Sequence, residues 1–369
     1  MASMLIALIA ATLIALLAGQ ALPKAFAAAP AFWAHIALAL GVMTLITAAM
    51  QHFVPVLCRS RGAGKWMARL PLLMLAAGLL AVTVLGGWLD YLWIALAALL
   101  ALGSSAAMIA WMLGKGRQAL GRPHPGLDWY VAAMACLGLA LAAALLIPFM
   151  PAWHAALRAF HLHLNLYGFV GLTAVGTLQV LMPTAAGQAD PQAGVRLRQD
   201  LKWAAAGSLA IALGQAAWLP LTWLGVALWA WPLGRMAWAW WRLHRARLLG
   251  LHGAEPVLFV AVLGYAASLA GLLQGETERG PLDLFLPAFL MPLVTGAAGV
   301  LAPVWLNPTR AAAHEAGRRV LNRWGSARAL LFLMPSVLFL LGYQCAGMPA
   351  LTALFWFGIV FAIWLHRQD

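Results

Sequence analysis

The sequence predicts an all-α, polytopic membrane protein with twelve transmembrane helices. Its 369 residues are 64% hydrophobic and only 9% charged, and their mean hydropathy is +0.88. A soluble globular domain contains about 25% charged residues, so the composition of this chain excludes a soluble protein. A spanning helix needs about 20 mainly apolar residues, and a chain of this length with short connections holds about twelve of them. Since no long polar stretch remains, we expect residues 1–369 to form a single transmembrane domain.

The apolar segments follow one another at short intervals, and each is long enough to cross the hydrocarbon core. No basic residues precede the first segment, which we therefore interpret as a retained helix and not as a cleaved signal peptide. The expected spans are 4–22, 31–56, 66–87, 90–113, 128–149, 156–183, 200–219, 221–243, 255–273, 282–305, 326–346 and 349–366.

The basic residues indicate the orientation of these spans. Of the 23 lysines and arginines, most follow even-numbered spans, which places both termini on the cytoplasmic side of a bacterial-type inner membrane. The net charge of +13 is spread over short loops, which argues against nucleic-acid binding and leaves membrane lipid as the expected partner. Arg235 lies inside span 221–243, where both a structural and a functional role stay open. The residues after even-numbered spans are Arg59, Arg61, Lys65, Arg69, Lys115, Arg117, Arg122, Arg196, Arg198, Lys202, Arg242, Arg245, Arg247, Arg310, Arg318, Arg319, Arg323, Arg328 and Arg367.

An internal repeat relates spans 2, 6 and 10. Residues 31–56 align with residues 159–184 without a gap, and residues 283–304 form a fainter third copy that has Asp283 in place of histidine. The sequence thus predicts three four-helix units, about 1–125, 126–250 and 251–369, related by a pseudo-threefold axis along the membrane normal. The identical pairs are Ala31/Ala159, Phe32/Phe160, His35/His163, Leu38/Leu166, Val42/Val170, Gln51/Gln179 and Pro55/Pro183; the third copy keeps Leu286, Gly296, Leu301 and Pro303.

Three of the ten histidines lie within apolar helix near the outer ends of spans 2 and 6: His35, His161 and His163. A buried imidazole needs a partner there, either a hydrogen bond to another helix or a metal. Neutral imidazole is a common axial ligand of haem iron. At about 100° per residue, His161 and His163 point to opposite sides of their helix. We therefore expect His35 and His163 to ligate one low-spin haem b, and His161 to contact a second haem or an open gas site.

Further residues are candidates for the same region. Arg158 is a candidate partner for a haem propionate or an interfacial cation, and Asn165 and Tyr167 are candidates for lining the pocket or for packing. His52 belongs to the cytoplasmic side of its span, and His154 lies near the outer surface. We expect the histidines at 124, 244, 252, 314 and 366 to be solvated. Cys58, Cys136 and Cys345 form no metal or disulfide pattern.

Two of these helices resemble a known family. The pattern from His35 through Gly41 to Pro55, H-x5-G-x13-P, resembles the second helix of haem-copper oxidase subunit I, which carries a low-spin haem ligand. The segment FHLHLNLYGFVG resembles that family's tenth helix, in which one histidine faces the high-spin haem and the next but one faces the low-spin haem. Twelve helices in three arcs is also the architecture of that family. The resemblance implies haem b, one or two per chain, and an oxidoreductase chemistry if the protein is an enzyme.

The sequence also departs from that family. Its sixth and seventh helices supply three histidines to a copper ion, whereas span 200–219 has no histidine and span 282–305 offers only Met291 as a soft ligand. We therefore expect no copper centre. All ten carboxylates are expected in loops or at helix ends, so we expect no proton pump. The span count and the histidines of helices 2 and 6 also resemble the NnrS group of haem membrane proteins, which is linked to nitric oxide stress.

Three functions remain open at this point. The first is electron transfer or binding of a diatomic gas by a haem protein whose partner is a redox donor protein or quinol. The second is a transporter, permease or haem- or copper-handling protein, which the repeats and proline-interrupted spans favour. The third is a non-catalytic partner subunit that keeps the bundle without the haem.

Overall fold

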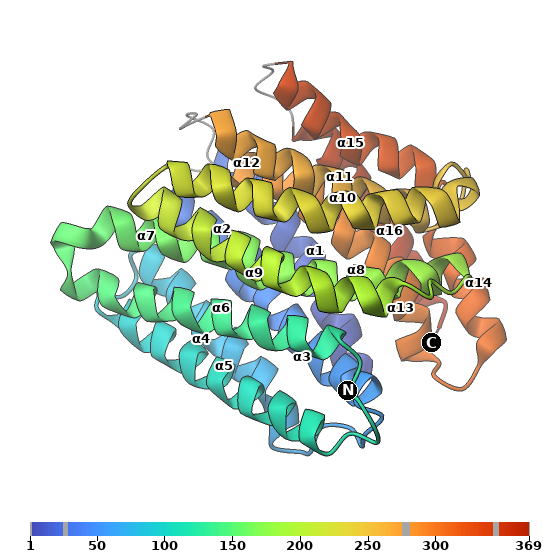
Figure 1. Ribbon diagram of the computed structural model, residues 1–369, viewed down its shortest axis with the longest axis horizontal. Helices are drawn as coiled ribbons and strands as arrows, with labels where there is room; N and C mark the ends of the chain where they lie inside the picture. Colours follow the sequence, from blue (N-terminus) through green and yellow to red (C-terminus); the bar gives the residue numbers. More distant parts are fainter. Residues whose placement is uncertain (1, 25–28, 275–280, 342–346, 369) are drawn as a thin grey trace. The chain divides into compact units, whose positions relative to one another are not determined.

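The computed structural model describes residues 2–24, 29–274, 281–341 and 347–368, and within these residues every regular element is a helix (Figure 1). The all-α class is thereby confirmed. The chain forms two compact units: unit 1 comprises Met1–Ala27, Val180–Asp190 and Leu233–Asp369, and unit 2 comprises Ala28–Gln179 and Pro191–Pro232. Cys345, named in the sequence argument, lies outside the described ranges.

Across the described ranges, nine helical stretches are long enough and apolar enough to cross a membrane, as expected of a polytopic protein. The other three expected spans overlap helices α9 (Ala193–Ala216), α10 (Pro220–Leu248) and α15 (Gly325–Leu340), and residues 342–346 of the expected span 326–346 lie outside the described ranges. Polar residues in α9, and tryptophans and arginines in α10, lower the hydropathy of these two helices, and α15 has only 16 residues. The nine stretches are Ala2–Ala21, Pro30–Leu57, Met67–Leu85, Trp93–Arg117, Gly126–Phe149, Pro151–Ala186, Glu255–Gln274, Leu282–Leu306 and Met348–His366.

Unit 2 contains both histidine-bearing helices. The first is built from α2 (Pro30–His35), a π-helical segment η2 (Ile36–Met43) and α3 (Thr44–Leu57). The second is built from α7 (His154–His163), the π-helical segment η6 (Leu164–Val170) and α8 (Gly171–Ala186), whose last turns belong to unit 1. They pack with α4 (Leu70–Leu85), α5 (Trp93–Arg117), α6 (Gly126–Leu146) and α9, and the first half of α10 belongs to the same unit.

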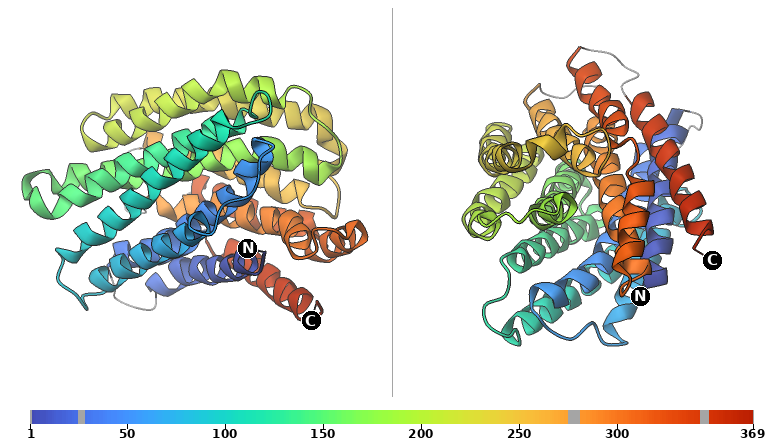
Figure 2. Two further views of the ribbon diagram at one scale, coloured as in Figure 1. Left: turned by 90° about the horizontal axis from the view of Figure 1, so that it is seen from below. Right: turned by 90° about the vertical axis from the view of Figure 1, so that its right-hand side faces the viewer.

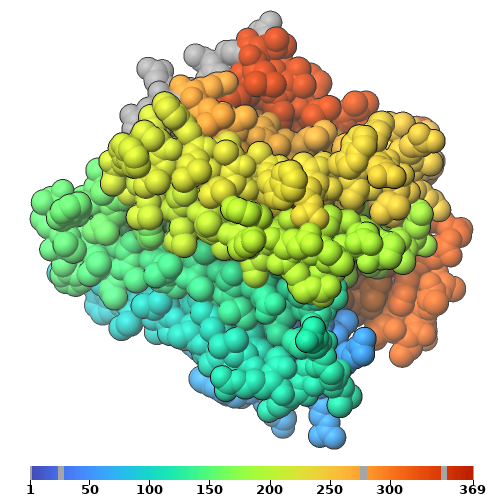
Figure 3. Space-filling model, viewed as in Figure 1, coloured from blue at the N-terminus to red at the C-terminus, as the bar shows by residue number. Residues whose placement is uncertain are grey.

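Glycines allow close approach of the helices around the second histidine-bearing helix. A β-carbon at Gly176 would lie 2.7 Å from the β-carbon of Trp129 in α6, and one at Gly168 would lie 2.8 Å from that of Cys136. The indole of Trp129 in turn donates to the carbonyl of Leu197 in α9 at 2.9 Å. Side chains fill the space between α6 and α9 on the face shown in Figure 3. The second histidine-bearing helix is thus fixed by contacts that only small residues permit.

Unit 1 contains α1 (Ala2–Ala21), α11 (Glu255–Gly271), α12 (Leu282–Leu284), the π-helical segment η8 (Phe285–Leu290), α13 (Met291–Leu306), the short helix α14 (Ala311–Leu321), α15 and α16 (Met348–His366) (Figure 2). In this unit, α13 packs against α1, α11 and α14, and α15 packs against α11 and α16. A β-carbon at Gly264 would lie 1.8 Å from the carbonyl oxygen of Ala288, so α11 and η8 are in direct backbone contact.

The three aligned segments share one local deviation from the α-helix. A π-helical stretch occupies residues 36–43, 164–170 and 285–290, which begin directly or shortly after His35, His163 and Asp283, respectively. Each segment also ends with a proline inside its helix, at Pro55, Pro183 and Pro303. Such π-helical stretches are rare in proteins, and those that occur are often found at functional sites. The repeat found in the sequence therefore has a counterpart in local backbone geometry.

Candidate functional site

His35 and His163, the aligned histidines, are held by their own helices in the same way. The Nδ1 atom of His35 lies 2.7 Å from the carbonyl oxygen of Ala31, and that of His163 lies 2.8 Å from the carbonyl oxygen of Ala159. A ring nitrogen facing a carbonyl oxygen must carry the hydrogen, so Nδ1 donates in both residues. In a neutral ring this leaves the lone pair on Nε2, the tautomer in which histidine binds a metal.

His161 takes the same tautomer through a different partner. Its Nδ1 atom donates to the carbonyl oxygen of Ala140 in α6 at 2.8 Å. The amide of Asn165, one turn later, donates to the His161 carbonyl at 2.7 Å, and its nitrogen lies 3.4 Å and 3.5 Å from the two ring nitrogens. All three predicted histidines thus use Nδ1 as a donor to the backbone, and Asn165 lies beside the His161 ring.

The structure brings His35 together with His161. Their ring centres are 6.2 Å apart and their planes differ by 8°. The ring stacked near His163 is that of Tyr167, at 6.3 Å and 12°. We expected His35 to pair with His163, and the structure instead brings the His35 ring beside that of His161. Positions related by a rotation have equivalent surroundings, but they do not have to face each other, and the sequence argument overlooked this.

The spacing of the two rings has a chemical consequence. Two metal–imidazole bonds of about 2.0 Å, plus about 1.1 Å from each ligating nitrogen to its ring centre, give a separation of about 6 Å. The centres of the stacked His35 and His161 rings are 6.2 Å apart, a distance close to this value. Both side chains are half-buried, whereas His163 is only 5% exposed. The His35–His161 pair is consequently the better candidate for holding a ligand between its rings.

Two other predicted residues lie away from this pair. Arg158 is exposed, and its charge acts on Tyr91: burial raises the pKa of the Tyr91 hydroxyl, and Arg158 lowers it in part. Tyr167 is fully buried on the His163 side, where its carbonyl accepts a hydrogen bond from Ser208 at 2.8 Å. The Ser208 hydroxyl also accepts the indole N–H of Trp229 at 3.1 Å. Tyr167 therefore anchors this side of the helix to α9 and α10.

The other histidines and cations singled out in the sequence are spread over both units. His52 is half-buried, with its ring edge-to-face with Phe53 at 5.4 Å. His154, the first residue of α7, is exposed, and Arg235 is half-buried. His124 is half-buried and accepts the backbone N–H of Gly126 at its Nδ1 atom.

Three buried polar residues were missed by the sequence argument. His244, expected to be solvated, is 1% exposed, and neither ring nitrogen has a hydrogen-bond partner among the described residues. Asp200 is fully buried in α9. The expected span began at residue 200, whereas the helix begins at Ala193, so Asp200 lies within the helix and not at its end. Arg328, assigned to a cytoplasmic connection, is 2% exposed in the first turn of α15. The sequence offers no signal for this burial beyond the proximity of each residue to an apolar helix.

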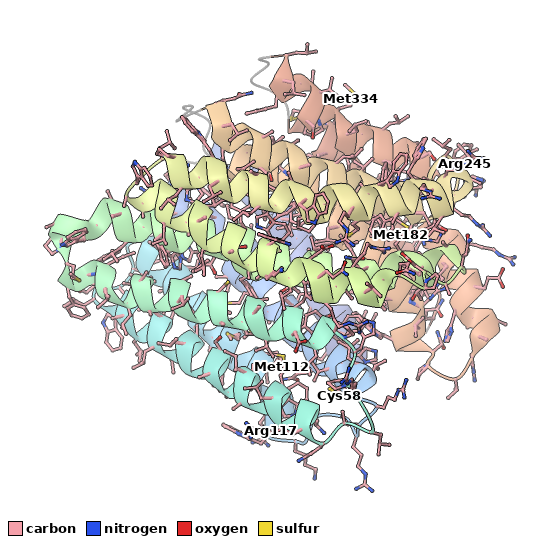
Figure 4. All side chains as sticks on the ribbon, viewed as in Figure 1. Cys58, Met112, Arg117, Met182, Arg245 and Met334 are labelled. Carbon is pink, nitrogen blue, oxygen red and sulfur yellow. The ribbon has the colours of Figure 1, made fainter. Side chains whose placement is uncertain are left out.

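Within the described ranges, no group of three or more histidine, cysteine or acidic side chains has the arrangement of a metal site. Cys58 and Cys136 are buried free thiols, and Cys58 lies at the same end of unit 2 as Arg117 (Figure 4). Burial raises the pKa of the Cys58 thiol, and the charge of Lys115 opposes this shift. His35 and His161 are a pair of neighbouring imidazoles in this part of the chain.

Comparison of the chain with protein-family models and with curated proteins finds no match.

Proposed function

We propose that this chain is a twelve-span membrane protein with an oxidase-like arrangement of helices, in which His35 and His161 hold one haem b and the haem transfers electrons. The observation that carries the proposal is the pair of nearly parallel imidazole rings 6.2 Å apart, each with Nδ1 bonded to a backbone carbonyl. The proposal includes no copper centre and no proton pumping.

The donor set favours a haem over a bare metal ion. A zinc or copper site is built from three or four protein ligands, and the described residues offer no such group. A haem brings four nitrogen ligands of its own and needs only two axial ones from the protein. His35 and His161 would be these two ligands, and the Ala31 and Ala140 carbonyls would fix their orientation.

Two axial histidines favour electron transfer over gas binding. A haem supplies one-electron chemistry when bound, and a site with both axial positions filled by protein leaves none open for a diatomic gas. The chain's own groups set the environment: Asn165 lies within 3.5 Å of the His161 ring, and the backbone bonds of both rings raise their basicity as ligands. Gas binding would then require one histidine to leave.

The twelve-span count is part of the same proposal. The helices α9, α10 and α15 stand where the repeat requires spans 7, 8 and 11, although they are less apolar or shorter than the other nine. The π-helical stretch and the helix-internal proline common to all three aligned segments support three equivalent units. The basic residues after even-numbered spans support termini on the cytoplasmic side.

A permease is the second candidate, and one observation favours it. The carboxylate of Asp200 is fully buried within α9, and buried ionisable residues in spanning helices often mark a transport path. The sequence argument had expected every carboxylate in a loop or at a helix end.

Metal analysis of the purified, chelator-washed protein separates these readings. The haem proposal predicts about one iron per chain and no stoichiometric copper. About one copper per chain would show that the protein binds copper without histidines in span 7, and that the inference of no copper centre is wrong. A protein with neither metal would refute the haem proposal and leave the permease.

A further inference from the structure

Arg328 carries a buried charge in unit 1, and the described residues give it no ionic partner. It lies in the first turn of α15 and is 2% exposed. A guanidinium has five N–H donors and stays protonated in proteins. Only Nη2 approaches an acceptor, the Asn322 side-chain oxygen at 3.5 Å, and Nε and Nη1 have no hydrogen-bond partner among the described residues. Burying a charge in this state is strongly unfavourable unless a counter-charge is supplied.

The neighbours of Arg328 hold the guanidinium in position without neutralising it. The Asn322 amide donates to the carbonyls of Gly299 and Arg318, at 2.9 Å and 3.0 Å, which turns its oxygen toward Arg328. A β-carbon at Gly299 would lie 2.2 Å from that oxygen, so only glycine leaves room for this amide. The Arg328 guanidinium carbon lies 4.7 Å above the ring centre of Phe357 in α16.

The surroundings of Arg328 are positive. It lies in the first turn of a 16-residue helix, at the end where the helix dipole is positive. Residues 310–328 contain five arginines and one acidic residue, Glu315, which is ion-paired to Arg319 on the exposed face of α14. Glu255 interacts electrostatically with Arg318. The charges of this region therefore attract an anion, and neither Glu315 nor Glu255 pairs with Arg328.

We propose that Arg328 is the centre of an anion site that takes a small planar oxoanion or carboxylate, of the size of formate or nitrate. The guanidinium edge matches two coplanar oxygen atoms, and the low exposure of Arg328 excludes a bulky ligand such as a lipid headgroup. The site is independent of the haem: all its residues belong to unit 1, whereas His35 and His161 belong to unit 2.

Binding of radiolabelled formate to the purified full chain tests this site, with nitrate as competitor and potassium gluconate to hold ionic strength constant. The wild type is expected to bind formate saturably, at about one per chain, and nitrate is expected to displace it. Arg328→Gln should weaken binding by more than about tenfold, because it removes the charged donor. Arg323→Gln, five residues earlier and exposed, is the matched control and should bind like the wild type.

A second variant keeps the test decisive if Arg328→Gln does not fold. Gly299→Ala leaves the charge in place but displaces the Asn322 amide, so formate binding should weaken while the protein stays folded by its tryptophan fluorescence. Formate binding that is absent in the wild type, or equal in the wild type and both site variants, would overturn the proposal.

Discussion

Replacing the three histidines one at a time distinguishes ligands from packing residues. His35→Ala and His161→Ala each remove one imidazole of the 6.2 Å pair. His163→Ala is the matched control. Like His35, His163 donates from Nδ1 to the carbonyl oxygen four residues earlier; the distance is 2.8 Å for His163 and 2.7 Å for His35. Each variant loses one backbone hydrogen bond, which contributes about 0.5–1.5 kcal/mol, so stability should fall by a similar amount in all three.

Haem content should separate the variants where stability does not. Changes to groups that merely orient a ligand lower metal affinity by about 10–100-fold, and loss of the ligand itself should cost at least as much. His35→Ala and His161→Ala should therefore lose most of their haem or show a five-coordinate spectrum. His163→Ala should keep the wild-type haem content and spectrum. The assay is haem per chain after purification, with the reduced absorption spectrum. Loss of haem in His163→Ala, with retention in His161→Ala, would refute the assigned pair and restore the one expected from the repeat.

Three further predictions concern packing, pH and orientation. Gly176→Ala should lower thermal stability by about 1–3 kcal/mol, because its β-carbon would overlap the tryptophan of α6; Gly103→Ala, which has open space around it, should not, and equal effects would contradict the packing. Burial and the charge of a nearby arginine lower the pKa of His124. Below pH ~6.5 the unfolded chain therefore binds a proton that the folded chain does not, and stability falls as the pH falls. His124→Gln should flatten this part of a pH series of melting temperatures, and an unchanged slope would exclude His124 as its source. Reporter fusions at Gly87 and Gln274 should read outside; a cytoplasmic signal at both would reverse the topology.

The helical class and most segment positions could be predicted because they depend on composition and length alone. The repeat was also visible in the sequence, through the aligned His, Gln and Pro residues of spans 2 and 6. Its third copy was faint, yet all three copies carry a π-helical stretch. Spacing therefore identified which segments are equivalent, even where few side chains are shared.

The side chains that meet could not be predicted to the same extent. Helical periodicity placed His161 and His163 on different sides of one helix, and the structure agrees, with one ring near His35 and the other near Tyr167. Which of the two faces His35 depends on how the helices of unit 2 are rotated against one another, and no pattern within one helix contains that information. The repeat identity of His35 and His163 favoured a pair other than the one whose rings lie side by side.

Burial of charge was the other limit. Asp200 and Arg328 were placed at helix ends or in connections, because hydropathy marks a helix only where apolar residues dominate. The helix α9 begins seven residues before the apolar run, so its first turns bury polar groups. Whether a charged residue near such an end is solvated depends on the neighbouring helices.

The central claim is that a haem lies between His35 and His161, and the absorption spectrum of the purified wild-type protein tests it most directly. Recorded oxidised and after dithionite reduction, the spectrum should show the sharp reduced α-band of a six-coordinate haem b. A colourless protein, or one whose spectrum does not change on reduction, would contradict the claim.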